Sequence, residues 1–207
     1  IAPGGVWNME WFAFVDQPAE ELAKYKKKGS LGEGIKTYAL FGALVGLALA
    51  IGLLVGIGFL PQSGPFAGFG IASVVILPIL FALISVVVSL IATGLTWIAA
   101  KIFGGDATFG NHYYLTSRMV WPIFGVGALL QALSLVMGVV ILPFTIIWTI
   151  YSVVINTEVV KAAHGLTTFR AYLSWVVPIL VLTVILFIVF AGLLFASGFV
   201  PPINSGI

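Results

Sequence analysis

The sequence predicts an all-helical integral membrane protein, a bundle of five transmembrane helices with a cytosolic N-terminus and an external C-terminus. Composition is the first observation: 61% of the 207 residues are hydrophobic and 8% are charged, whereas about a quarter of a soluble domain is charged. The second is the length of the apolar runs, which reach the roughly 20 residues needed to cross a bilayer. The third is the confinement of charge to alternate loops.

Residues 1–34 are predicted to form a cytosolic or interfacial segment that contains one short helix. Acidic residues and Pro18 begin this helix, and a cluster of four lysines ends it. No basic region followed by an apolar run opens the sequence, so we predict no signal peptide. Ser30 and Glu33 then form a capping box that begins the first span.

Five apolar runs are predicted to cross the membrane. They cover residues 35–60, 71–103, 113–137, 143–163 and 171–197, and an external tail follows over residues 198–207. The apolar stretch 119–155 would measure roughly 55 Å as one helix, which is too long for a single crossing. We therefore expect a tight hairpin that turns near Gly138 and returns from Pro143.

Small residues form a stripe along each of the first two spans. Such stripes allow two membrane helices to approach closely, as in the GxxxG motif. We expect the two spans to pack on each other through these positions, which are Gly42, Gly46, Gly52 and Gly56 on the first and Ala82, Ser85, Ser89 and Ala92 on the second.

The distribution of charge predicts the orientation. Every lysine and arginine precedes the first span, or lies between spans two and three or between spans four and five. The positive-inside rule places these segments in the cytosol. All seven acidic residues fall on the same side. This asymmetry favours five spans over four, because removing the hairpin would move Lys161 and Arg170 outside.

The three helices that start on the cytosolic side share a pattern of glycine, a hydroxyl residue and then tyrosine. The first N–H groups of such helices need acceptors before water becomes scarce, and capping side chains provide them. The predicted helix caps are Ser30, Glu33, Asp106, Thr108 and Thr168.

Several short motifs carry a family resemblance. They are an aromatic-proline-acid helix near the N-terminus, Lys-Gly-Ser-Leu before span one, Gly-Gly-Asp-Ala-Thr-Phe before a Trp-Pro span, and Lys-Ala-Ala-His-Gly-Leu-Thr-Thr-Phe-Arg-Ala before span five. Over residues 10–197 the chain resembles the Yip family (Ypt-interacting proteins), specifically its prokaryotic members. The resemblance implies five spans, a cytosolic N-terminus and the cell membrane of a prokaryote. Eukaryotic members are linked to Rab-type small GTPases. Their long N-terminal region with an Asp-Leu-Tyr-Gly type motif is missing from this sequence, so GTPase binding is not carried over.

Neither catalysis, nor a cofactor, nor a metal site is predicted. No nucleophile and base can be paired, and a net charge of +2 is too small to argue for nucleic acid. The two histidines with Asp106 or Glu158 have suitable ligand types for a metal, but they lack a short fixed spacing such as His-Glu-x-x-His. No ionisable residue lies near the middle of a span, which disfavours a proton-coupled pump.

The polar residues of the cytosolic side form a candidate interaction face. Glu158 and Lys161 are expected to pair on one helix, and Arg118 is expected to snorkel or to pair with Glu158. The complete set is Asp106, Asn111, His112, Arg118, Glu158, Lys161, His164 and Arg170.

These observations favour a non-enzymatic scaffold, adaptor or membrane-organising protein. We expect it to contact membrane lipids and to bind a protein partner or a second copy of itself at the cytosolic face. Two alternatives stay open. The small-residue stripes and the single proline in each of the last four spans suit a transporter of a small uncharged solute or lipid, and an accessory subunit of a larger membrane complex fits as well.

Overall fold

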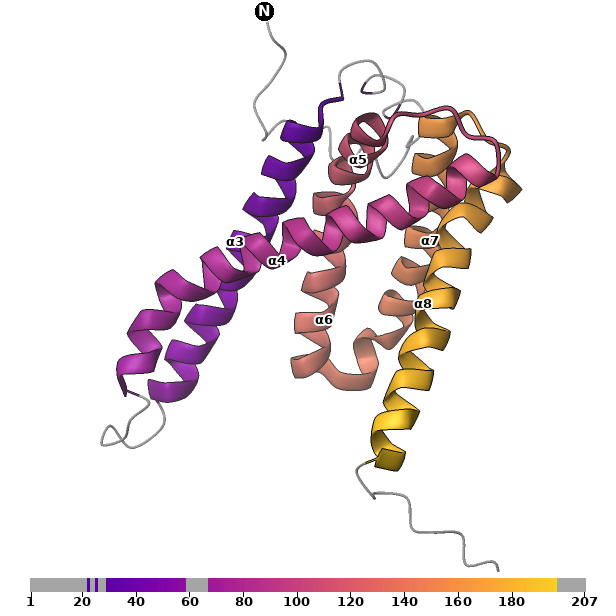
Figure 1. Cartoon of the computed structure of the whole chain (residues 1–207). Helices are drawn as coiled ribbons and strands as arrows, with labels where there is room; N and C mark the ends of the chain where they lie inside the picture. Colours follow the sequence, from indigo (N-terminus) through magenta and orange to yellow (C-terminus); the bar gives the residue numbers. More distant parts are fainter. Residues whose placement is uncertain (1–21, 23–24, 26–28, 59–66, 197–207) are drawn as a thin grey trace, which may run out of the picture.

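The computed structural model describes residues 22, 25, 29–58 and 67–196. Within these ranges every regular element is a helix (Figure 1). α3 (Leu31–Gly58) and α4 (Ala67–Ile102) form a long hairpin. The chain then runs through α5 (Phe109–Arg118), the π-helical turn η1 (Val120–Gly125) and α6 (Val126–Met137). It returns through η2 (Gly138–Ile141) and α7 (Leu142–His164), and α8 (Thr168–Ala196) follows.

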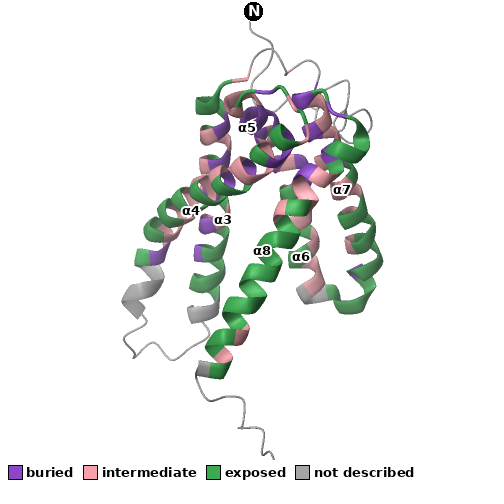
Figure 2. Cartoon of the chain, turned by 45° about the vertical axis from the view of Figure 1, so that its right-hand side comes forward, coloured by how far each residue is buried: buried purple, intermediate pink, exposed green. Residues whose placement is uncertain are grey.

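Four of the described helices are long and apolar enough to cross a membrane. They are Leu31–Val55, Ala72–Ile102, Gly138–His164 and Thr168–Phe195. Their outer surfaces are apolar: on α8 all residues from Leu180 to Phe190 are exposed, and Thr183 alone among them is polar (Figure 2). An exposed apolar surface of this extent is stable against lipid and not against water. The predicted all-helical, multi-pass membrane class is therefore confirmed.

The predicted third span, residues 113–137, is not one continuous helix. α5 ends at Arg118, a π-helical turn follows, and α6 begins at Val126. The turn contains Pro122, which has no N–H to donate to the carbonyl of Arg118 and whose ring crowds that carbonyl. A wider π-type turn relieves this conflict. The segment as a whole still runs from one end of the molecule to the other in Figure 1.

We call the upper end of the molecule in Figure 1 the polar end. It comprises the start of α3 at Leu31, the end of α4 at Ile102, α5, the end of α7 at His164 and the start of α8 at Thr168. The turn between α6 and α7 and the end of α8 lie at the opposite end. The buried core gathers at the polar end, where Leu115, Met119, Ile155 and Val159 are almost inaccessible.

Glycine terminates both helices of the second hairpin. Gly138 follows α6 with φ 54° and Gly165 follows α7 with φ 67°, a region that residues with a Cβ rarely adopt. The N–H of Gly165 donates to the carbonyl of Lys161 at 2.8 Å, which satisfies one of the last carbonyls of α7. The turn near Gly138 lies where the sequence predicts it.

Two glycines of the predicted stripe bring α3 onto the backbone of α4. A Cβ on Gly42 would overlap the carbonyl oxygen of Phe81, and one on Gly46 would overlap that of Leu77. Between these contacts and the polar end, Ser85 Oγ donates to the carbonyl oxygen of Tyr38 at 2.8 Å. α4 is about 54 Å long at 1.5 Å per residue and runs obliquely past its neighbours (Figure 1).

The remaining stripe positions do not all contact the partner helix. A Cβ on Gly52 would have no neighbour within 4 Å, because two inclined helices approach most closely over only a few turns. Ser89 is buried, Ala82 is half-buried and Ala92 is exposed. The surroundings of Gly56 lie outside the described side chains.

The helix caps follow the predictions in part. Ser30 Oγ accepts from the N–H of Glu33 at 3.2 Å, and Thr108 Oγ1 accepts from the N–H of Asn111 at 3.4 Å. The carboxylate of Glu33 forms an ion pair with Lys36 Nζ at 2.8 Å. The capping box predicted that it would instead accept a hydrogen bond from the backbone N–H of Ser30.

Two predicted caps differ from the structure. Because α5 starts directly after Thr108, Asp106 lies too early in the chain to cap it, and because Thr168 is already helical, Thr167 occupies the position before α8. The predicted N-terminal helix, apart from Leu22 and Tyr25, and the predicted tail 198–207 lie outside the described residues.

Candidate functional site

The short helix α5 occupies the centre of the polar end. It is rich in polar residues, yet five of its ten residues are buried. Thr108 caps its first turn, and α3, α4 and α7 surround it. Buried polar side chains require hydrogen-bond partners, so the contacts of α5 determine which groups of the predicted interaction face remain available.

His112 of α5 and His164 at the end of α7 form a buried pair. Their side chains are 1% and 2% exposed, and His164 Nε2 lies 3.1 Å from His112 Nδ1. One ring must donate and the other must accept, so at least one of the two is neutral. Burial, with His164 as the second cause, lowers the pKa of His112 to about 3. His112 precedes the predicted span that starts at Tyr113, and its imidazole is uncharged at neutral pH.

The loop before α5 fits closely around His164. A Cβ on Gly105 would overlap the His164 ring, and the N–H of Asp106 lies 3.4 Å from the carbonyl oxygen of His164. Glycine at position 105 is therefore required by the approach of the loop to the imidazole. The second glycine and the aspartate of the Gly-Gly-Asp motif therefore both contact His164.

The histidine pair has the geometry of a hydrogen bond. Among the residues that the structure describes, no group of three or more His, Cys, Asp or Glu side chains could hold a metal ion. Asp106, one of the carboxylates considered with the histidines, is exposed. The described polar end therefore offers no assembled metal site.

Arg118 has different partners from those predicted. Its Nη2 donates to the Tyr114 hydroxyl at 2.6 Å, and its guanidinium lies 4.8 Å from the ring centre of Tyr25 and 4.9 Å from that of Tyr114. Such cation–π contacts hold Arg118 against Tyr25, which precedes the first span. Glu158, the predicted alternative partner, binds Lys161 of its own helix at 3.1 Å.

The eight residues of the predicted interaction face differ in solvent exposure. His112 and His164 lie in the interior. Asn111, Arg118, Glu158 and Lys161 are half-buried, whereas Asp106 and Arg170 are exposed. Arg170 Nη1 lies 3.5 Å from the carbonyl oxygen of Phe103, the first residue after α4. The structure brings the two histidines together, and of the eight residues only Asp106 and Arg170 are exposed.

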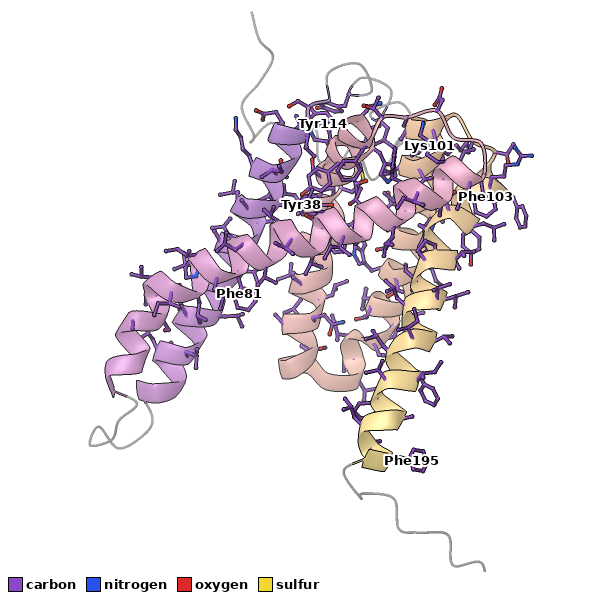
Figure 3. The ribbon with its side chains drawn as sticks, viewed as in Figure 1. Tyr38, Phe81, Lys101, Phe103, Tyr114 and Phe195 are labelled. Carbon is purple, nitrogen blue, oxygen red and sulfur yellow. The ribbon has the colours of Figure 1, made fainter. Side chains whose placement is uncertain are left out.

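A cavity of about 590 Å³ lies between the α3–α4 hairpin and the group formed by α5, η1, α7 and α8. Its volume falls within the range typical of small-molecule pockets, roughly 300–1,000 Å³. Tyr38, in its wall, lies nearer the polar end than Phe81, which also lines it (Figure 3). The wall is mostly apolar, and among the residues that the structure describes no Lys, Arg, Asp or Glu lines it. Its polar residues are Ser85, Ser89, Thr93, Thr96, His112, Thr116 and Asn156.

Sequence reasoning missed this cavity. Ser85, Ser89 and Ala92 have the spacing of a packing stripe, yet all three also line the cavity. The available signal was the presence of Thr93, Thr96 and Asn156 within apolar runs, since polar groups in spans face protein or a cavity more often than lipid.

The four long apolar helices and the cavity beside them define an all-helical, multi-pass membrane protein. No family model, curated protein or solved structure matches the chain.

Proposed function

We propose that this chain is a non-enzymatic, five-pass membrane protein that binds an uncharged lipid or a similar small apolar molecule in its cavity. The cavity itself is the observation that supports the proposal. It lies among the apolar helices, within the part of the molecule that faces lipid. Its wall carries no permanently charged side chain, and an unpaired charge on a ligand would be costly at that depth.

The five crossings consist of the four long helices and the broken segment 113–137. None of its helical pieces is long enough to cross a membrane alone, but together they run from the polar end to the turn that precedes α7 (Figure 1). With it, every basic residue of the described chain falls at or near the polar end, which the positive-inside rule assigns to the cytosol. The resemblance to prokaryotic Yip proteins suggests the cell membrane as the location.

A reporter fused to the C-terminus is expected to lie outside the cytosol, because an odd number of crossings separates it from a cytosolic N-terminus. Paired fusions of alkaline phosphatase and green fluorescent protein would measure this directly. The same reporters fused after Gly105, in the loop at the polar end, should give the cytosolic result. A cytosolic C-terminus would contradict the cytosolic position of the polar end, because α8 runs from the polar end to the opposite end.

Filling the cavity is expected to expel the bound molecule. Ala92 is exposed and lines the cavity, so phenylalanine at this position would occupy the space without displacing backbone. We expect Ala92→Phe to reduce the lipid that co-purifies with the protein by about 10-fold, which corresponds to about 1.4 kcal/mol. Native mass spectrometry and lipid extraction would measure the loss.

The matched control is Ala72→Phe, because Ala72 is an exposed residue of the same helix that does not line the cavity. Its bound lipid should equal that of the wild type. Equal lipid content in both variants, or none in the wild type, would contradict binding in the cavity.

A scaffold or adaptor role is the second candidate function. Two exposed charged residues, Asp106 in the loop before α5 and Arg170 in the first turn of α8, lie at the polar end and are available to a protein partner or a second copy. The burial of His112 and His164 removes these two residues from any such surface. If the C-terminal reporter were cytosolic, the polar end would face outward and a cytosolic partner could not bind there.

A further inference from the structure

Three hydroxyl groups of the cavity wall have already donated their hydrogen to the protein. Ser85 Oγ donates to the carbonyl of Tyr38 at 2.8 Å. Thr96 Oγ1 donates to the carbonyl of Ala92 at 3.1 Å, and Thr116 Oγ1 donates to that of His112 at 2.9 Å. A carbonyl oxygen can only accept, so each hydroxyl must be the donor. Each therefore retains only its acceptor lone pairs for a molecule in the cavity.

Three further polar groups of the wall, those of Ser89, His112 and Asn156, are engaged as well. Ser89 Oγ lies 2.9 Å from the carbonyl of Val86 and 2.6 Å from the hydroxyl of Tyr113. His112 Nδ1 is bonded to His164. Asn156 Nδ2 donates one hydrogen to the carbonyl of Ser152 at 2.8 Å, so its amide keeps an oxygen acceptor and a single further donor. Among Ser85, Ser89, Thr96, Thr116 and Asn156, acceptors thus outnumber donors.

Of these groups, Thr96, Thr116 and Asn156 lie toward the polar end of the cavity, whereas Ser85 lies farther along α4, between Ile84 and Val88. Thr96 precedes the end of α4 at Ile102 by about 9 Å, and Asn156 precedes the end of α7 at His164 by about 12 Å, at 1.5 Å per residue. Phe81 lies farther from the polar end (Figure 3), and Ile84, Val88 and Ile179 also contribute apolar wall. The cavity is therefore more polar toward its cytosolic end and more apolar beyond it. An amphiphile has a polar headgroup and an apolar chain, so it matches this distribution.

We infer that the cavity selects neutral amphiphiles whose headgroup donates a hydrogen bond, such as a diacylglycerol or a long-chain alcohol. The hydroxyl of the ligand donates its single hydrogen to one of the oxygens of Thr96, Thr116 and Asn156, and its chain extends along the apolar wall. A matched ether or ester that only accepts hydrogen bonds leaves these oxygens unsatisfied. This inference rests on the proposed function and specifies the class of ligand.

Quenching of Trp175 fluorescence provides the test, because Trp175 lines the cavity. The protein in phosphatidylcholine nanodiscs would be titrated with a chain-brominated long-chain alcohol and with its methyl ether. Subtracting the signal of Trp175→Phe isolates this tryptophan from the others. We expect half-maximal quenching at a roughly 3- to 20-fold lower mole fraction for the alcohol than for the ether, which is the range for one or two hydrogen bonds within a membrane.

Isosteric variants identify the groups responsible. Thr96→Val and Thr116→Val, singly and together with Asn156→Leu, should reduce the preference for the alcohol toward unity while the ether binds as before. The matched control is Thr183→Val: Thr183 donates to the carbonyl of Ile179 at 2.8 Å in the same way, but it is exposed on α8 and does not line the cavity. It should keep the full preference.

The possible outcomes separate the inference from the proposed function. Equal quenching by alcohol and ether would overturn the donor preference while leaving the cavity as a binding site. A preference that survives all three wall variants would also overturn it. If neither compound quenches Trp175, both the inference and the proposed binding function fail.

Discussion

Replacing Gly46 by valine is expected to destabilise the protein by about 3 kcal/mol, at the upper end of the usual range for overpacking. The added side chain would overlap the carbonyl oxygen of Leu77, and its Cβ would lie 2.8 Å from the Cα of Pro78. Both are backbone atoms, which cannot rotate away as the end of a side chain can. Separation of α3 from α4 is the only relief, and unfolding in mixed detergent micelles would measure its cost.

Gly52→Val is the control for this prediction. Gly52 lies on the same helix, and a Cβ there would meet nothing within 4 Å. Its substitution should change the free energy of unfolding by no more than about 0.5 kcal/mol, as expected for a surface position. Similar losses for Gly46→Val and Gly52→Val would show that the α3–α4 contact contributes little.

Acidification is expected to destabilise the polar end through His112. The pKa of His112 in the folded protein, about 3, lies below its ordinary value of 6.5. The unfolded chain therefore takes up a proton first as the pH falls, and protonation favours unfolding. The stability contribution should be constant above about pH 6.5 and should fall by up to about 1.4 kcal/mol per pH unit from there toward pH 3.

Unfolding measured across this pH range in the wild type and in His112→Gln would check the prediction. Glutamine keeps hydrogen-bonding capacity but does not titrate, so the variant should be less stable at pH 7 and should lose less stability on acidification. An identical slope in both proteins would assign the pH dependence to other groups.

Local features of the chain were predictable from the sequence alone. The helix-ending glycines at positions 138 and 165 and the cap at Thr108 depend on residues close together in sequence, as does the ion pair of Glu158 with Lys161 three positions later. Conformational freedom and side-chain reach within one helical turn determine such features. They can therefore be predicted without knowing the fold.

Contacts between helices were not predictable in the same way. In a soluble protein an apolar stripe marks the buried face of a helix, but here the lipid-facing and protein-facing sides are both apolar. The broad stripe on α3 therefore did not reveal that Gly42 and Gly46 contact α4 while Gly52 does not. Arg118 could not be assigned to Tyr114 and Tyr25 from its charge, which suggested Glu158.

The sequence by itself thus determined the membrane class, the helices and their turns, because apolar run length, charge placement and capping residues act locally. Only the tertiary structure decided that Pro122 breaks the third apolar run, that His112 meets His164 across 52 residues, and that a cavity remains beside α4. The physical reason is that these features depend on how closely apolar surfaces fit each other. Helix packing in lipid is determined by shape and by a few hydrogen bonds, and the pattern of polarity along the chain carries little of that information.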